Sequence, residues 1–136
     1  MRARNEVTRK QARRLLAKET SHAEIQDAVC DVLKLYKIVH SVTDASRTFG
    51  PDGKPRKSKV EPGWPDITAC IRAYGADPGR FVGLEVKTQS DRQSKKQRDC
   101  ARSIYEAGGM YFIVRSTAIC LLILEQWFKI GPGRKP

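Results

Sequence analysis

The sequence predicts an α/β domain in which helices flank a single mixed β-sheet. Three observations lead to this prediction. An amphipathic helical pattern opens the folded part of the chain, two apolar runs are joined by a hairpin-type loop, and a further helix separates the second run from another apolar strand. With 136 residues, 40% of them hydrophobic, the chain can bury the core of one such domain.

The first helix is expected at about 21–37. Its start has the form of a capping box, with Ser21 as the N-cap and Glu24 three residues later. Apolar residues then recur at helical spacing: Ile25, Ala28, Val29, Val32, Leu33 and Tyr36. Capping alone explains Glu24, so the pattern gives this residue no further role by itself.

Three strands follow, at 38–43, 65–72 and 80–87. In the first, Ile38, His40 and Val42 alternate on one side, and His40 is interpreted as structural because no metal spacing or nucleophile accompanies it. The next two are joined by a loop rich in Gly, Asp and Pro, which is typical of a hairpin. We therefore expect these two strands to be antiparallel neighbours.

The remaining elements are a helix at 94–107, a strand at 110–115 and a helix at 117–129. Ser94 opens the first of these helices and a Gly pair ends it. Its inner face is expected to carry Gln97, Ala101, Ile104 and Tyr105, and that of the last helix Ile119, Leu122, Ile123 and Trp127. The crossover through the 94–107 helix should make the strand at 110–115 parallel to its predecessor. The predicted order is α-β-β-β-α-β-α.

Charge indicates a polyanionic partner. Lys and Arg number 26 against 15 Asp and Glu, for a net charge of +11, which points to nucleic acid or an anionic membrane surface. No segment has the large apolar face of a lipid-inserting helix, and no run approaches the ~18 apolar residues that span a bilayer. We expect no membrane association, and the Arg-rich start without an apolar core predicts a cytoplasmic protein rather than a secreted one.

Three basic segments lie outside the predicted elements. Residues 1–19 form either a solvated tail or a phosphate-binding arm ahead of a domain at 20–130, and residues 131–136 are expected to be a flexible tail. The long loop at 44–62 is either a flexible surface loop or a grip on a phosphate backbone. Together with the helix at 94–107, this loop supplies the candidate DNA-binding residues: Arg47, Lys54, Arg56, Lys57, Lys59, Lys95, Lys96 and Arg98.

The cysteines predict thiols rather than a zinc or redox motif. Cys30, Cys70, Cys100 and Cys120 are far apart in sequence, so no Cys-x-x-Cys pair exists. Each lies within or beside an apolar pattern. Reduced, packed thiols are the expectation, although the even number leaves disulfides open.

A candidate site is predicted where Asp66 and Glu85 meet. Asp66 starts one arm of the hairpin and Glu85 ends the other, and Lys87 shares the face of Glu85 on the strand. Two carboxylates brought together need a cation between them, and Mg²⁺ takes one or two carboxylates together with water and phosphate. Each part also has an ordinary explanation: a Glu-x-Lys pair is commonly a solvated cross-strand pair, and Pro-Asp is a common turn signal.

The set as a whole resembles the VRR-NUC family of the PD-(D/E)xK nuclease superfamily, and its arrangement is similar to that of Holliday-junction resolvases. The matching pieces are Glu24, Gly63-x-Pro65-Asp66, Glu85-Val86-Lys87 and Ser94-x-x-Gln97, in this order across 21–116. The resemblance implies a restriction-endonuclease-like fold and a stand-alone protein of phage or bacterial type.

The resemblance also implies roles for these residues. Asp66, Glu85 and the Val86 carbonyl would bind Mg²⁺, for which Mn²⁺ would substitute, and Glu24 would be a second-metal or water-mediated ligand. Lys87 would position the attacking water or stabilise the phosphate. Gln97 would organise the metal shell or the scissile phosphate, although capping of backbone groups is the alternative for this residue.

The activity implied is that of a Mg-dependent endodeoxyribonuclease acting as a homodimer on branched DNA such as a four-way junction. Two other possibilities remain open. The chain could cut flapped, nicked or duplex DNA, or RNA, or it could be a non-catalytic nucleic-acid-binding module that keeps the fold for its basic surface.

Overall fold

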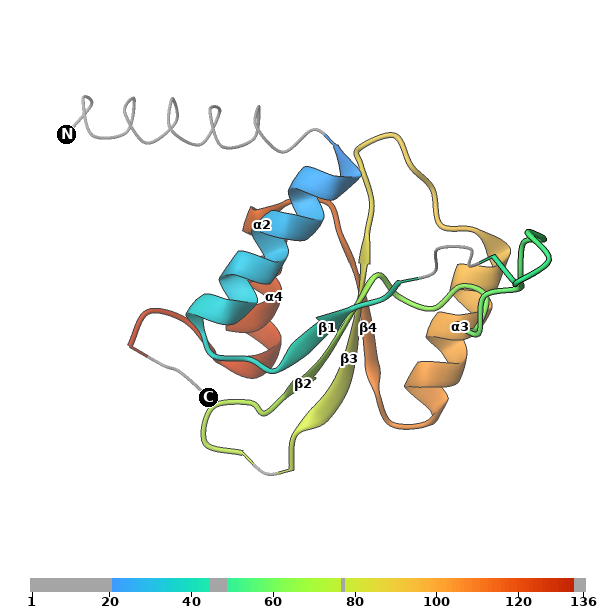
Figure 1. Cartoon of the computed structure of the whole chain (residues 1–136). Coiled ribbons are helices and arrows are strands. Elements are labelled where there is room, and N and C mark those ends of the chain that lie inside the picture. Colours follow the sequence, from blue (N-terminus) through green and yellow to red (C-terminus); the bar gives the residue numbers. More distant parts are fainter. Residues whose placement is uncertain (1–20, 45–48, 77, 134–136) are drawn as a thin grey trace.

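The structure is a computed structural model that describes residues 21–44, 49–76 and 78–133. The predicted basic arm at 1–19, Arg47 and the last three residues of the predicted tail lie outside these described residues. In the described part, helices lie on both faces of a central sheet (Figure 1). This is the predicted α/β class.

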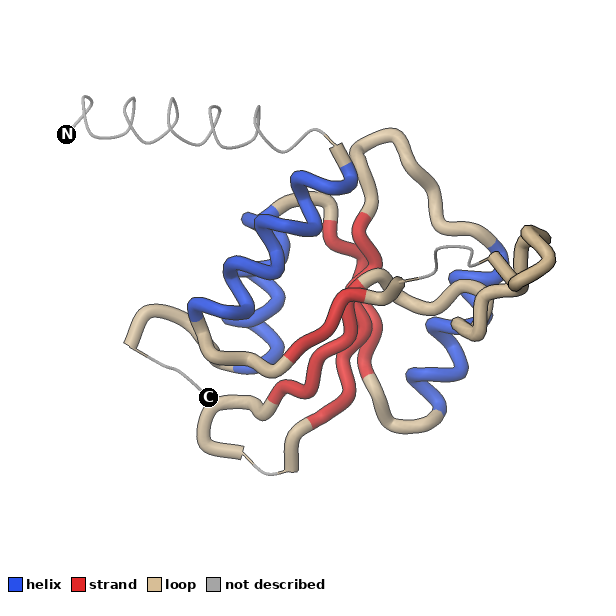
Figure 2. Tube along the Cα trace, viewed as in Figure 1, coloured by secondary structure: helices blue, strands red, loops and turns tan. Residues whose placement is uncertain are grey.

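The sheet has four strands in the described residues: β1 (His40–Val42), β2 (Ile67–Ile71), β3 (Arg80–Val86) and β4 (Met110–Val114), in the spatial order β1-β2-β3-β4. The β1–β2 and β2–β3 pairs are antiparallel, and β3–β4 is parallel. Figure 2 shows the strands side by side between the helices. The predicted hairpin and the predicted parallel pair are both confirmed, whereas β1 is shorter than the predicted 38–43.

In the part of the chain that the structure describes, three helices cover the sheet. α2 (His22–Leu35) and α4 (Thr117–Phe128) lie on one face and pack on each other, while α3 (Lys95–Glu106) covers the other face beside β4 (Figure 1). The main core lies between the sheet and the helices α2 and α4, where alternate residues of β2 and β3 meet the apolar stripe of α2. The opposite face of β3, under α3, is therefore the one that carries Phe81, Gly83 and Glu85.

Two predicted helix faces are wrong in part. On α4 the buried side chains are Cys120, Ile123, Leu124 and Phe128, whereas Ile119 and Leu122 are exposed and Trp127 is 59% exposed. This helix is apolar on nearly every side, so its periodicity does not select a face, and packing on α2 and β4 does. On α3, Ile104 is buried as predicted, but Tyr105 is 73% exposed and Cys100 takes the inner position.

The cysteines also differ from the prediction at one position. All four are free thiols, and Cys30, Cys100 and Cys120 are buried. Cys70 is exposed because it alternates with Ala69 and Ile71, which fill the core side of β2. None of the helices within 21–44, 49–76 and 78–133 is both long enough and apolar enough to cross a membrane.

Candidate functional site

The β2–β3 hairpin brings Asp66 and Glu85 together. Ile67 pairs with Leu84, so Asp66, one residue before β2, lies opposite Glu85 on β3. Asp66 Oδ2 accepts a hydrogen bond of 2.8 Å from the backbone N–H of Val86, which fixes the carboxylate at the end of the ladder. The segment before Asp66 can approach this closely because Gly83 has no side chain: an added Cβ would lie 2.7 Å from Pro65 Cγ.

Glu85 lies at the centre of a hydrogen-bonded cluster. It is only 3% exposed. Its Oε1 accepts a hydrogen bond of 2.8 Å from Gln97 Nε2, and its Oε2 accepts a hydrogen bond of 3.1 Å from the Tyr111 hydroxyl. Lys87 Nζ lies 4.0 Å from Oε1, and the Lys87 side chain is 12% exposed. Side chains from β3, β4 and α3 therefore converge on one carboxyl group.

Burial sets the charge balance of this cluster. It is the main cause that raises the pKa of Glu85 from 4.5 to about 7, and the charge and hydrogen bonding of Asp66 add to it. Tyr111 and Lys87 act in the opposite direction but do not cancel the rise. Burial, followed by the charge of Glu85, also raises the pKa of Tyr111, so this hydroxyl stays a donor at neutral pH. Ionisation of Glu85 beside Asp66 is thus unfavourable in this buried position.

Gln97 connects this cluster to the first turn of α3. Its backbone N–H donates to Ser94 Oγ at 3.2 Å, and its Oε1 accepts 2.9 Å from the Ser94 N–H, which completes a capping box. Its Nε2 remains available and donates to Glu85. The capping role and the site contact that the sequence left as alternatives are therefore both present in the geometry.

The first turn of α2 contributes a residue that the sequence analysis missed. His22 Nε2 lies 3.2 Å from Asp66 Oδ2. Glu24, the predicted residue on this turn, is exposed, and its backbone N–H donates to Ser21 Oγ as the capping pattern predicts. Its role as a metal ligand stays a prediction.

Tyr111 was also missed. The signal was present, because Tyr111 pairs with Gly83 and so shares the sheet face of Glu85. It could not be used before the parallel register of β3 and β4 was known. His22 had no comparable signal, because it sits beside the N-cap where exposed polar residues are ordinary.

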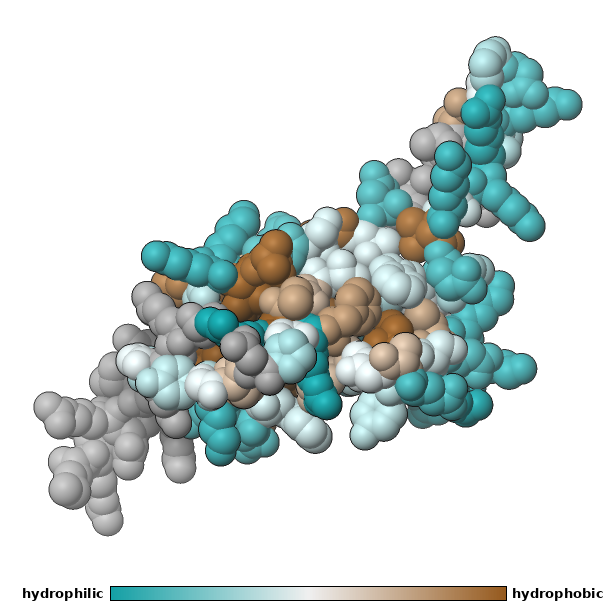
Figure 3. Space-filling view, turned by 90° about the horizontal axis from the view of Figure 1, so that it is seen from below, coloured by the Kyte–Doolittle hydropathy of each residue, from teal (hydrophilic) through white to brown (hydrophobic). Residues whose placement is uncertain are grey.

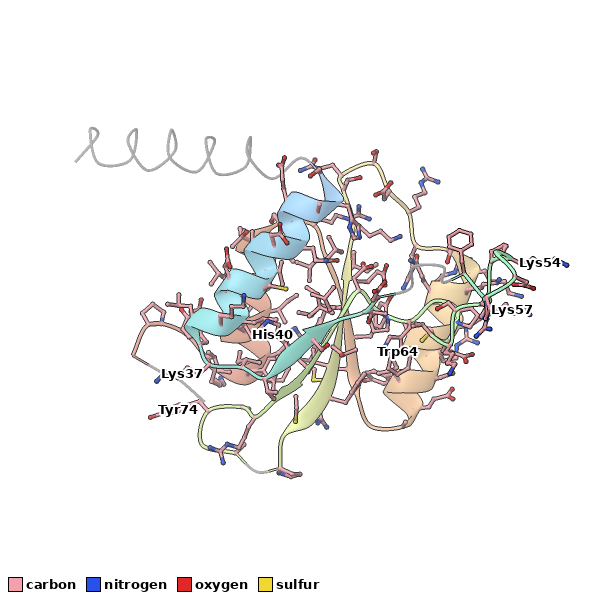
Figure 4. All side chains as sticks on the ribbon, in the orientation of Figure 1. Lys37, His40, Lys54, Lys57, Trp64 and Tyr74 are labelled. Atoms are coloured by element: carbon pink, nitrogen blue, oxygen red, sulfur yellow. The ribbon has the colours of Figure 1, made fainter. Side chains whose placement is uncertain are left out.

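The candidate DNA-binding residues flank this cluster in two groups. Lys95, Lys96 and Arg98 lie on the first turn of α3 and are exposed; Arg98 donates 2.8 Å to the Gln93 carbonyl. The other described candidates, Lys54, Arg56, Lys57 and Lys59, are all exposed and form what we call the basic segment, residues 54–59. Figure 3 shows this part of the chain projecting from the body as a hydrophilic arm, and Figure 4 labels Lys54 and Lys57 on it.

A glycine holds the chain that follows the basic segment against the helix. Gly63 has φ +81, and a Cβ there would lie 2.3 Å from the Lys96 carbonyl oxygen. The chain leading to Asp66 thus passes in backbone contact over the first turn of α3. This contact places the cationic first turn of α3 beside the stretch of chain that joins the basic segment to Asp66.

The donors at this site suit a hard divalent ion. Asp66 and Glu85 supply carboxylates, and the Val86 carbonyl lies between Glu85 and Lys87 in the chain. Within the part of the chain that the structure describes, no group of three or more His, Cys, Asp and Glu is arranged to hold a metal. A Mg²⁺ site needs only one or two carboxylates, with water completing the shell. A cation bound to both carboxylates would lower the raised pKa of Glu85, because it favours the charged form.

Comparison with known proteins shows a likeness in fold. No protein-family model matches the chain, and no curated protein matches it. A solved structure described as a "VRR_NUC domain protein" is similar, with a TM-score of 0.53 over 84% of this chain and 93% of the other, at 19% sequence identity. At this identity the likeness establishes a shared fold, and the fold matches the one that the sequence motifs imply.

Proposed function

We propose that the chain is a metal-dependent nuclease of the VRR-NUC type that hydrolyses phosphodiester bonds in DNA. The observation that carries this proposal is the buried Glu85, paired with Asp66 and contacted by Gln97, Tyr111 and Lys87, at the cationic first turn of α3. The shared fold with a VRR_NUC domain protein supports the same assignment.

Phosphodiester hydrolysis makes two demands that these residues are suited to meet. The scissile phosphate gains negative charge as water attacks, and the water must lose a proton near neutral pH. A bound Mg²⁺ or Mn²⁺, held by Asp66, Glu85 and the Val86 carbonyl, would acidify water and offset phosphate charge. Lys87, close to Glu85 and largely shielded from solvent, would orient the water or neutralise a phosphate oxygen.

The other residues would hold this arrangement in place. Gln97 fixes Glu85 Oε1 while it caps α3, and the Tyr111 hydroxyl fixes Oε2, so both carboxylate oxygens keep their orientation. Glu24 would act through water or a second ion from the first turn of α2. The Lys and Arg residues of the basic segment and of α3 would bind the phosphate backbone on either side of the cut.

Branched DNA is the substrate we favour, as in Holliday-junction resolvases, with a homodimer to supply two symmetric sites. Flapped, nicked or duplex DNA is the second candidate for the same chemistry. A non-catalytic binding module is a weaker explanation, because buried acidic groups that face phosphate would only oppose binding.

Cleavage assays distinguish these functions. Purified protein with Mg²⁺ or Mn²⁺ is incubated with a labelled four-way junction, a 5′ flap, a nicked duplex and a linear duplex. Lys87→Ala should abolish cleavage but keep DNA binding, whereas the control Lys34→Ala, which removes an exposed lysine from α2, should cleave normally. Paired symmetric cuts in the junction would support the resolvase role.

Cuts in flaps or duplexes alone would keep the nuclease and discard the resolvase role. Binding without cleavage of any substrate under either metal would overturn the nuclease proposal in favour of a binding module.

A further inference from the structure

An apolar pocket lies under α3, outside the Asp66–Glu85 cluster. Its volume is about 470 Å³, and we call it the α3 pocket. It is lined by Trp64 and Phe81 and by Cys100 and Ile104 of α3. The two aromatic rings are in contact, with centroids 5.7 Å apart and planes inclined at 53°. Gly109 also lines the pocket, and an added Cβ there would lie 2.8 Å from Ile104 and 3.2 Å from Phe81.

Two polar groups line the pocket. Glu61 contributes a carboxylate and Ser103 a hydroxyl. A flat ligand stacked on an aromatic ring, with N–H groups at its edge, would match an apolar wall with an acceptor at its rim. Nucleobases have this chemistry, since every base has a π face and most carry an exocyclic amine or a ring N–H.

Charge around the pocket favours a polyanion as the source of that ligand. A second hollow, of about 690 Å³, runs along residues 55–64 and shares Glu61 and Trp64 with the α3 pocket. It is lined by Arg56, Lys57 and Lys59. Trp64, labelled in Figure 4, therefore lines both the apolar pocket and the cationic groove. Positive grooves next to aromatic platforms are the usual way in which proteins hold single-stranded nucleic acid.

The pocket is also close to the proposed site of cleavage. Phe81 and Glu85 lie on the same face of β3, four residues apart, which is about 13 Å at the rise of a strand. A stacked strand, which rises 3.4 Å along its axis for each nucleotide, covers that distance in about four nucleotides, and an extended strand covers it in fewer. A strand with its phosphate near Asp66 could thus place a base up to about four nucleotides away in the α3 pocket, but only if that base were unpaired.

We propose that the α3 pocket binds an unpaired nucleobase within about four nucleotides of the cleaved phosphate, so that the substrate must contain single-stranded or unstacked nucleotides. This inference rests on the proposed function, because it requires nucleic acid at the basic segment. It narrows the substrate class to junctions, flaps or single strands and excludes fully paired duplex as the preferred substrate.

Fluorescence of Trp64 tests the contact directly. The chain has two tryptophans, so Trp127→Phe leaves Trp64 as the only one. This variant is titrated in EDTA with a single strand, with a deoxyribose-phosphate chain of the same length that lacks bases, and with a blunt duplex. We expect Trp64 emission to change with the single strand and to stay unchanged with the other two, even where they bind.

A filled pocket gives the matched test. Ala107→Leu adds an isopropyl group to a pocket-lining position at the end of α3, and Ala118→Leu adds the same group to an exposed position on α4, across the sheet. Loss of one stacked base should weaken single-strand binding by about 5- to 150-fold in Ala107→Leu. Duplex binding by this variant, and all binding by Ala118→Leu, should be unchanged.

The possible failures are distinguishable. If strands with and without bases bind alike and the two Leu variants behave alike, the inference is overturned while the proposed function stands. If Ala107→Leu instead changes the sedimenting mass of the protein, a second copy occupies the pocket and the inference is also overturned. If no oligonucleotide binds at all, the proposed function fails and takes the inference with it.

Discussion

Glu85 should make the free energy of unfolding depend on pH. Its pKa is about 7 in the folded protein against an ordinary value of 4.5, so the folded state binds this proton more tightly than the unfolded state does. Between these two values the unfolded chain has lost the proton while the folded chain keeps it. Stability from this group is therefore fully present below about pH 4.5 and is lost as pH rises to about 7.

The size of the effect follows from the same two values. The interval from 4.5 to about 7 corresponds to about 3 kcal/mol, at 1.36 kcal/mol for each pKa unit. We expect ~1–2 kcal/mol, because burial is the larger cause of the shift and water weakens the smaller part that comes from Asp66, which is 26% exposed. Glu85→Gln removes the charge and keeps an acceptor for Gln97, so its own stability should not depend on this titration. Between pH 5 and pH 8 the free energy of unfolding of the wild type should therefore fall by this amount relative to that of the variant.

Urea unfolding at pH 5, 6, 7 and 8 measures this difference. Glu106→Gln, which neutralises an exposed acid at the end of α3, is the control for general charge effects. Added Mg²⁺ at pH 8 should raise the midpoint of the wild type and not that of Glu85→Gln, since a ligand stabilises only the state that binds it. Parallel pH curves for the wild type and both variants would refute the reasoning about the buried carboxyl pair.

Three further results are expected. Gly63→Ala should destabilise by ~2 kcal/mol or more, because its Cβ would meet backbone, whereas Gly53→Ala, with positive φ but open space, should cost ~1 kcal/mol in the same melt. Replacing all four cations of the basic segment by Ala should lower the slope of log K against log salt for duplex DNA, by up to about 0.9 for each phosphate that the variant no longer neutralises; an unchanged slope would show that the segment does not touch DNA. Cys70 should react with a thiol reagent in the native protein, whereas Cys120, whose pKa burial raises to about 12, should react only after unfolding, as mass spectrometry can follow.

Much of the fold was predictable because its signals are local. The capping patterns at Ser21 and Ser94 set the starts of two helices, and both caps are present in the structure. The hairpin loop and the crossover helix set the order of β2, β3 and β4. By contrast, the buried face of α4 was not predictable from its nearly uniform apolar sequence, since that face depends on where α2 and β4 lie.

The candidate site likewise has one part that local sequence signals predict and another that depends on tertiary packing. The juxtaposition of Asp66 and Glu85 followed from one hairpin, whose two arms are close in sequence. The contact of His22 with Asp66 joins residues 44 positions apart, and that of Tyr111 with Glu85 joins residues 26 positions apart. No local sequence pattern predicts either contact. Sequence spacing can thus predict a pair within one supersecondary unit, whereas the contacts around the pair depend on how separate units pack.

The pairing of Ile67 with Leu84 has a consequence for how this protein can vary. Both residues are buried in the main core, and Glu85 faces the other side of the sheet. A slip of one residue between β2 and β3 would carry Glu85 into that core and Leu84 out toward α3. The packing of Ile67 and Leu84 in the core therefore fixes the register of β2 and β3, and with it the position of Asp66 opposite Glu85. Insertions between the strands are compatible with the proposed chemistry only within the turn, whereas a single residue gained or lost inside either strand would abolish the site together with the core.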